Sequence, residues 1–190
     1  MESNYSIREL TEDEFSPLFD RHKQFIFEEV HSYSPKDLLT GAELQSIEHL
    51  GQAAASLPYK LFLGVFDSNN EFVGWSWGEQ ENSSTFYMVN SAVLPAHRRR
   101  GLYSALLARC IEVLANKGFQ IIYSRHCATN NAVIVPKLQA GFIISAMEMD
   151  DKYGVLIHLR FYTNRDRRRI MDYRSGQLKP DEKTKQAFKL

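Results

Sequence analysis

The stretch VLPAHRRRGLYSALL, residues 93–107, decides the fold because a strand pattern ends in it and a helix pattern begins. Three consecutive arginines lead into Gly101, and apolar residues at helical spacing follow. A helix N-terminus exposes backbone N–H groups that lack a partner within the helix, and it carries partial positive charge. Arginines there, beside a glycine that lets the backbone approach a ligand closely, predict a site for an anion such as phosphate. A solvated basic loop is the alternative interpretation.

Hydrophobic periodicity on both sides of this stretch predicts an alternation of strands and helices. Thr11 and Glu14 have the spacing of a capping box, which predicts the start of the first helix. Antiparallel hairpins combined with one strand–helix–strand crossover are typical of an α+β protein with a mixed sheet, not of a doubly wound sheet. The predicted strands cover residues 6–10, 59–67, 71–80, 86–94, 120–127, 142–150 and 155–162, and the predicted helices cover residues 11–30, 41–56, 101–116 and 130–140.

Composition places the chain among soluble globular proteins. Hydrophobic residues make up 44% of its 190 residues and charged residues 24%, and the formal net charge is zero. This neutral balance gives no global indication of a nucleic-acid partner. The N-terminal segment is polar and acidic, and no apolar run reaches the roughly 18 residues of a membrane span, so we expect a cytoplasmic protein without a membrane partner. Cys110 and Cys127 are expected to be reduced and buried, and no Cys/His spacing suggests a metal.

Residues 93–107 are similar to the acetyl-CoA motif of the GNAT superfamily of N-acyltransferases, V-x-P-x-x-[RQ]-x-x-G-x-[GA]. A second block, NNAVIVPKLQAGF at residues 130–142, resembles the family's N-x-x-A-x-x-x-Y-x-x-x-G-F. The order of elements and the spacing between the two blocks also fit the family, and the resemblance extends over residues 59–162. The residues in register with the two motifs are Val93, Pro95, Arg98, Gly101, Asn130, Gly141 and Phe142.

The resemblance implies a GNAT-like α+β fold over residues 1–163, a mixed and mostly antiparallel sheet that is flanked by helices and splayed between its fourth and fifth strands. Acetyl-CoA would lie in that splay, with its pantetheine arm paired to the backbone near Ala92 and Val93 and its far end held by Asn130. A bulge near residues 90–91 would free an N–H that polarises the thioester oxygen. The pyrophosphate would rest on the amides of Arg98, Arg99, Arg100, Gly101, Leu102, Tyr103 and Ser104.

The activity that the resemblance implies is transfer of the acetyl group of acetyl-CoA to a primary amine of a small molecule or peptide. The amine would attack the thioester directly, with no metal and no nucleic acid involved. Members of the family often pair through edge strands or C-terminal elements, which leaves a homodimer open. One alternative is a catalytically weak acyl-CoA-binding module with a regulatory or interaction role. Another is an enzyme that transfers a longer acyl group or uses an oxygen acceptor.

Three positions depart from the family's pattern. Arg99 stands where glycine is common, and Tyr103 stands where the family usually has glycine or alanine. Lys137 stands at the position of a tyrosine that commonly protonates the leaving thiolate. Two interpretations of Lys137 follow: it donates that proton instead, or it is an ordinary solvated helix residue. A thiolate with a pKa of about 8.5 is a tolerable leaving group in either case.

The base is a separate question, because an amine acceptor arrives protonated and must lose a proton before it attacks. Strand alternation places Glu79 on one face with Trp75 and Trp77, which makes it one candidate; a surface glutamate at a turn is the alternative. His126 on the predicted fifth strand is the second candidate, and a structural strand histidine is its alternative.

Residues 164–190 are predicted to form a separate basic tail or helix, with nine basic and four acidic side chains between residues 165 and 190. We interpret its start as a surface helix docked by Ile170, Met171 and Tyr173. A contact with the coenzyme phosphate, an acidic acceptor, a second subunit or nucleic acid is the alternative.

Overall fold

The computed structural model describes residues 4–27, 58–179, 181–182 and 185. The predicted helix over residues 41–56 and the predicted end of the first helix lie outside these residues. Each predicted strand and helix that falls within them is present, with its described boundaries within one residue of the prediction. The strands are β1 (Tyr5–Leu10), β2 (Lys60–Asp67), β3 (Phe72–Gln80), β4 (Thr85–Val93), β5 (Ile121–Cys127), β6 (Ile143–Asp150) and β7 (Gly154–Tyr162). The helices are α1 (Glu12–Phe27), α3 (Leu102–Asn116), α4 (Asn131–Gln139), α5 (Arg165–Arg174) and a short 3-10 helix, η2 (Pro95–His97).

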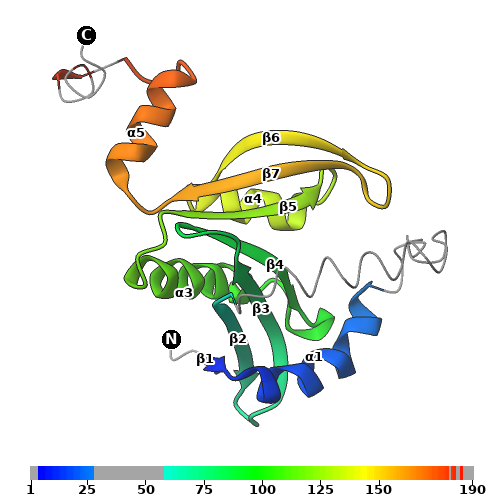
Figure 1. Cartoon of the computed structure of the whole chain (residues 1–190). Coiled ribbons are helices and arrows are strands. Elements are labelled where there is room, and N and C mark those ends of the chain that lie inside the picture. The colour runs from blue at the N-terminus through cyan, green and yellow to red at the C-terminus, as the bar shows by residue number, and fades with distance from the viewer. Residues whose placement is uncertain (1–3, 28–57, 180, 183–184, 186–190) are drawn as a thin grey trace, which may run out of the picture.

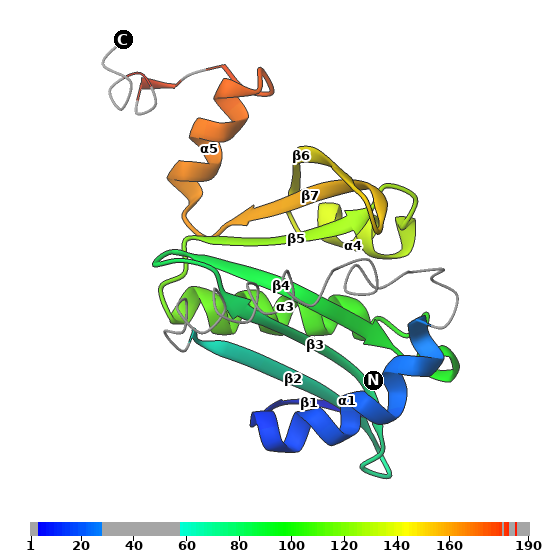
Figure 2. The ribbon, with the colours of Figure 1, turned by 45° about the vertical axis from the view of Figure 1, so that its right-hand side comes forward.

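One sheet of seven strands, in the order β1-β2-β3-β4-β5-β7-β6, runs through the molecule (Figure 1). Neighbouring strands are antiparallel except β4 and β5, which are parallel because the chain crosses between them through α3. These two strands pair only between residues 85–87 and residues 121–123 and then diverge (Figure 2). The predicted α+β fold, with a mixed sheet splayed between its fourth and fifth strands, is therefore confirmed.

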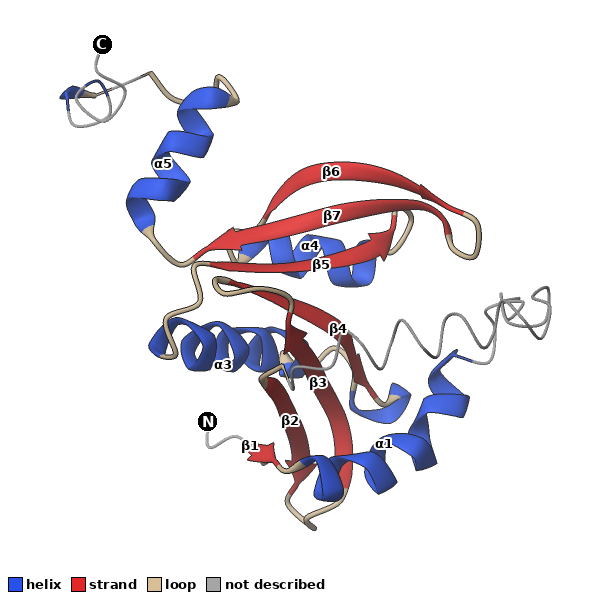
Figure 3. Ribbon diagram, viewed as in Figure 1, coloured by secondary structure: helices blue, strands red, loops and turns tan. Residues whose placement is uncertain are grey.

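Two apolar cores lie on opposite faces of the sheet, with α3 and α4 over one face and α1 over the other (Figure 3). Strand alternation in β2 shows the division, because Leu61 and Leu63 point into the first core and Phe62 and Phe66 into the second. Burial of each such side chain stabilises the fold by roughly 1.5–3 kcal/mol. The helices are thus held at fixed positions relative to the diverging strands.

The start of α1 is a capping box, as predicted from its sequence. The backbone N–H of Glu14 donates to Oγ1 of Thr11 at 3.2 Å, and the backbone N–H of Thr11 donates to Oε2 of Glu14 at 2.8 Å. These bonds satisfy donors that a helix N-terminus otherwise leaves unpaired, which fixes where α1 begins beside β1.

A bulge interrupts β4 close to the predicted position. Trp77 of β3 pairs with Asn90 but the next residue, Gly78, pairs with Met88, so Val89 is the extra residue. The bulge therefore lies one residue before the predicted segment at residues 90–91. Two side-chain bonds fix the strand just beyond it: the indole N–H of Trp75 donates to Asn90 at 2.7 Å, and Ser91 donates to Ser76 at 2.9 Å.

The tail begins with a helix, α5, as predicted. The side chain of Asn164 caps it by accepting from the backbone N–H groups of Asp166 and Arg167. The guanidinium of Arg168 donates to the carbonyl of Gly141, which ties the helix to the loop after α4. Ile170, Met171 and Tyr173 are half-buried. Within the described ranges, no helix is both long and apolar enough to cross a membrane.

Both cysteines are free, but they differ in exposure. Cys110 is buried in the first core, as predicted. The expectation that Cys127 is also buried is wrong, because Cys127 is the last residue of β5 and is exposed where that strand leaves the core.

This difference predicts selective alkylation. Burial raises the pKa of the Cys110 thiol to about 12, and the thiolate is the reactive form, so only Cys127 should react with iodoacetamide in the native protein. Peptide mapping after brief treatment measures the labelling, and Cys127→Ser should abolish it. Equal labelling of both thiols in the folded protein would contradict the placement of Cys110.

Candidate functional site

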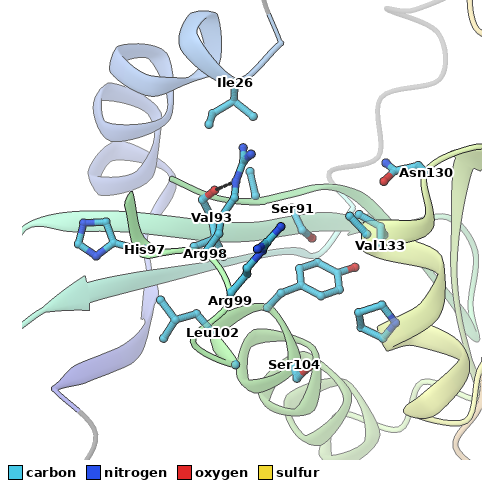
Figure 4. A pocket seen from close by; sticks show the side chains of 15 residues that line it. Ile26, Ser91, Val93, His97, Arg98, Arg99, Leu102, Ser104, Asn130 and Val133 are labelled. Carbon is cyan, nitrogen blue, oxygen red and sulfur yellow. Dashed lines mark hydrogen bonds between the residues drawn. The ribbon is translucent and has the colours of Figure 1, made fainter. Parts of the chain in front are cut away.

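A cavity of about 750 Å³ opens between the end of β4, the start of α3 and the start of α4. Its volume falls within the range of ordinary small-molecule and cofactor sites. In Figure 4 the side chains of Arg98 and Arg99 extend from the turn before α3, Val133 approaches from α4, and Asn130 lies just before that helix. The residues that line the cavity are Ile26, Ser91, Ala92, Val93, His97, Arg98, Arg99, Gly101, Leu102, Tyr103, Ser104, Asn130, Ala132, Val133 and Pro136.

The backbone at the start of α3 presents unpaired N–H groups to this cavity. Gly101 is the residue before the helix and has a left-handed backbone with φ of 78°. The first bond inside the helix is from the N–H of Ala105 to the carbonyl of Gly101 at 3.0 Å, so the N–H groups of residues 102–104 precede it. No acidic residue lies in the first turn to offset the positive end of the helix dipole. The local geometry is that of an anion site.

Arg99 also has a left-handed backbone, with φ of 60°. A side chain other than glycine is disfavoured in this region, which explains why glycine is common at this position in the family that the sequence resembles. The turn therefore keeps the backbone path of a glycine while adding a guanidinium at the cavity rim. Among the described residues, the Arg99 side chain has no hydrogen-bond or ion-pair partner, so its charge is available to a ligand.

The three arginines are not equivalent. Arg98 lines the cavity, and its Nε donates to the carbonyl of Val93 at 2.9 Å, which leaves its terminal nitrogens exposed. Arg100 turns away and donates to the hydroxyl of Tyr5 at 2.8 Å and to the carbonyl of Ala96 at 3.3 Å. Of the ten residues predicted to hold a coenzyme, Arg100 is the one that does not line the cavity.

Backbone groups of β4 face the gap opposite β5. The backbone N–H of Leu94 donates to the carbonyl of Val73 in β3 at 2.9 Å. In an antiparallel pair, alternate residues direct their backbone N–H and C=O groups to opposite sides, so the backbone groups of Ser91 and Val93 point away from β3. The bond from Arg98 to the carbonyl of Val93 agrees with that direction. Because β5 has already diverged, no described strand pairs with the backbone groups of Ser91 and the N–H of Val93, and an extended ligand can pair with them.

Lys137 is buried, with 1% of its surface exposed, so the interpretation as a solvated helix residue is wrong. Its ammonium donates to the hydroxyl of Ser124 at 2.6 Å and contacts the sulfur of Met88 at 3.4 Å. The last pair between β4 and β5 is Tyr87 with Tyr123, so Met88 and Ser124 are the first residues of each strand beyond it. The lysine therefore lies at the fork where the two strands separate.

A hydrogen-bonded chain continues from Lys137 to His126. The Nε2 atom of His126 is 2.9 Å from the hydroxyl of Ser124, and both side chains point to the same face of β5. Burial lowers the pKa of Lys137 to about 7. Burial and the nearby Lys137 lower the pKa of His126 to about 3, so its imidazole is neutral at physiological pH. This chain of hydrogen bonds joins the enclosed amine of Lys137 to the half-buried imidazole of His126.

The three predicted proton-transfer residues do not line the cavity. Lys137 and His126 are joined through Ser124, whereas Glu79 lies on β3 between Lys60 and Tyr87 and is only half-buried. Sequence reasoning missed Ser124, although its spacing of two residues from His126 on one strand places both on one face. It also missed the α4 side of the cavity, where Val133 and Pro136 follow Asn130 at intervals of three.

A family model described as the acetyltransferase (GNAT) family matches residues 5–142 of the chain. The match covers well over half of the sequence and includes the cavity, β4, α3 and α4. The chain therefore belongs to the GNAT acetyltransferase family, and it is an acyltransferase by class. No curated protein matches the sequence.

Solved structures of acetyltransferases share the fold at low sequence identity. A putative acetyltransferase, yncA of Salmonella typhimurium, solved with acetyl-CoA, aligns with a TM-score of 0.63 at 14% identity, covering 86% of this chain and 96% of that one. The ribosomal-protein-S18-alanine N-acetyltransferase of Escherichia coli aligns with a TM-score of 0.58 at 16% identity, covering 84% and 94%. A dodecameric spermidine N-acetyltransferase of Vibrio cholerae aligns with a TM-score of 0.60 at 13% identity, covering 87% and 98%.

Proposed function

We propose that this protein transfers the acetyl group of acetyl-CoA to a primary amine. The observation that carries this function is that one cavity combines a positively charged part with an apolar part next to a strand edge. Exposed Arg98 and Arg99, together with the amides at the start of α3, form a site for phosphates. The edge of β4 that no described strand pairs with and the apolar side of α4 extend from it. A molecule with a pyrophosphate at one end and a long, neutral, amide-containing arm matches both parts.

In this assignment each predicted coenzyme residue has a defined task. Gly101, Leu102, Tyr103 and Ser104 present backbone N–H groups to the pyrophosphate, and Arg98 and Arg99 neutralise its charge. Ala92 and Val93 bring the free edge of β4 to the pantetheine arm, and Asn130 lies at its far end. Arg100 is left to hold the turn against β1 through Tyr5.

The chemistry requires two proton movements. The attacking amine must lose a proton, and the sulfur that leaves the acyl carbon must gain one. Lys137 has a pKa of about 7, below the roughly 8.5 of a free thiol, so proton transfer from its ammonium to a thiolate is favourable. The proposed role of Lys137 is therefore proton donor at the fork.

The path of that proton follows from the contacts of Lys137. Met88 and Ser124 enclose the ammonium, and of these two only the serine hydroxyl can both accept and donate a proton. Ser124 continues to His126, so we assign the Lys137–Ser124–His126 chain to proton exchange at the fork. Glu79 has no bond to this chain among the described residues, and its proposed role as base stands on its position alone.

The amine acceptor is proposed to be a small molecule or a peptide. The E. coli and V. cholerae enzymes above are named for an alanine of a ribosomal protein and for spermidine, which represent both types. A homodimer is likewise proposed. The apolar side chains exposed on the edge strand β6, Met147 and Met149, are consistent with it.

The deciding experiment combines calorimetric titration with acetyl-CoA and a thiol-release assay across a panel of amines. Saturable binding with a rise in melting temperature and amine-dependent release of free thiol would support the acetyltransferase. Binding without thiol release for any amine would favour the alternative, a catalytically weak acyl-CoA-binding module. Absence of binding at high coenzyme concentration would contradict both functions.

A further inference from the structure

The hydroxyl of Tyr103 is buried and has no hydrogen-bond partner among the described residues. Tyr103 lies in the first turn of α3, lines the cavity and packs with its ring against the first core. A buried hydroxyl without a partner is unfavourable, and native proteins seldom keep one without a reason. Phenylalanine would fill the same space without that penalty. The hydroxyl therefore needs an explanation that packing does not supply.

Part of the cavity that Tyr103 lines is apolar. Val133 and Pro136 of α4 line the same cavity opposite α3, and Ala92 and Val93 line it from β4. Burial raises the pKa of the Tyr103 phenol, so the hydroxyl is protonated and can act as a donor. Because no described residue accepts from it, a ligand in the cavity can supply the acceptor.

The position of the hydroxyl indicates which part of a ligand it meets. Arg98 and Arg99, the groups suited to phosphates, are exposed at the rim, whereas the Tyr103 hydroxyl is enclosed. A neutral acceptor is better matched to an enclosed site without a cation than a phosphate is. The neutral acceptors of the coenzyme next to its phosphates lie in the pantetheine arm, where the amide carbonyls are stronger acceptors than the hydroxyl.

We propose that the hydroxyl of Tyr103 donates a hydrogen bond to an amide carbonyl in the pantetheine arm of the bound coenzyme. This inference rests on the proposed function and adds to it a side-chain contact of Tyr103, whose backbone N–H is already assigned to the pyrophosphate. In the free protein the hydroxyl has no partner among the residues that the structure describes, and in the complex the ligand supplies one. The tyrosine at position 103, where the family usually has glycine or alanine, then contacts the coenzyme and does not obstruct its site.

Tyr103→Phe should leave the stability of the free protein equal or higher and should lower its affinity for the coenzyme. Without ligand, its melting temperature should equal or exceed that of the wild type, because no bond is lost. Its dissociation constant for coenzyme A should rise about fivefold to tenfold, the effect of one neutral hydrogen bond. The matched control is Tyr123→Phe, since the Tyr123 hydroxyl donates to Glu81 within the protein. That variant should lose thermal stability and keep its affinity for coenzyme A.

Calorimetry with two probes completes the test. Adenosine 3′,5′-diphosphate carries phosphates but no arm, and it should bind Tyr103→Phe and the wild type equally. If Tyr103→Phe lost as much affinity for this probe as for coenzyme A, the assignment to the arm would be overturned. Unchanged affinity of Tyr103→Phe for coenzyme A would also overturn it. A melting temperature of Tyr103→Phe lowered as in the control would show a partner within the protein and overturn the proposal. A wild-type protein that binds neither probe would overturn the proposed function as well.

Discussion

The double substitution Arg98→Ala with Gly101→Asp is expected to weaken acetyl-CoA binding by about 100-fold while the protein stays folded. The first change removes a cation from the cavity rim, and charge-assisted bonds contribute roughly 1.5–3 kcal/mol each. The second places a carboxylate at the positive end of α3, where it competes with the phosphates for the same amides. About 1.4 kcal/mol corresponds to a factor of ten, so two such losses give about 100-fold.

The fold should survive these changes for local reasons. A Cβ atom at Gly101 would meet no heavy atom within 4 Å, although its φ of 78° makes a side chain there mildly strained. The control is Arg100→Ala, which removes a neighbouring arginine that bonds to Tyr5 and does not line the cavity. Calorimetry should give near wild-type affinity for the control. Wild-type affinity in a folded double variant would contradict the phosphate site.

Lys137→Met is expected to lower amine-dependent thiol release by about 100-fold, the lower range of general acid–base contributions. Methionine has nearly the same length and is apolar, so it fills the enclosed space without a charge. The same variant should also change how stability depends on pH. The pKa of Lys137 is lowered to about 7 in the folded protein, from 10.5 for the free side chain, so between these values the unfolded chain binds the additional proton. Stability of the wild type therefore rises with pH in this window.

The size of that rise is about 1.4 kcal/mol per pH unit, or about 2–3 kcal/mol between pH 7 and pH 9. The window ends near pH 9 because burial raises the pKa of Cys110 from 9.0 to about 12. Above pH 9 the unfolded chain loses the thiol proton before the folded protein does, so Cys110 lowers the stability as the pH rises further. Urea unfolding of the wild type and Lys137→Met at both pH values measures the difference. Lys117→Met, at an exposed lysine, should retain the wild-type slope. A variant with full turnover and an unchanged pH slope would contradict both the proton-donor role and the burial of a neutral amine.

The sequence allowed the turn and the helix start of the proposed anion site to be predicted because their determinants are local. The end of a strand, a turn with Gly101 and the first turn of a helix follow one another within fifteen residues. The proposed site consists mainly of the backbone N–H groups of this segment. The direction of Arg100 is not local, since it depends on Tyr5, 95 positions away in the chain. The exact place of the bulge depends on the register between β3 and β4, which periodicity alone does not specify.

The surroundings of Lys137 could not be predicted for a related reason. Lysine is rarely buried, so its residue type favours the solvated interpretation. Its burial depends on Met88 and Ser124, which reach it from β4 and β5 only once the sheet has formed. The exposure of Cys127 likewise depends on where β5 leaves the core, which an apolar strand pattern does not show.

The brief pairing of β4 with β5 has a mechanical consequence. In the described part of the chain, three residue pairs and the adjoining bonds from Gln120 and Ile121 to Ser84 join the backbones of a leaf of four strands and a leaf of three, so the sheet has a seam along its middle. The crossing helix α3 and the core that it shares with both leaves hold the seam closed from one side. A coenzyme lying between β4 and α4 would act as a further crosslink across it. The line along which the sheet has the fewest backbone pairs thus coincides with the line along which we propose that the coenzyme binds.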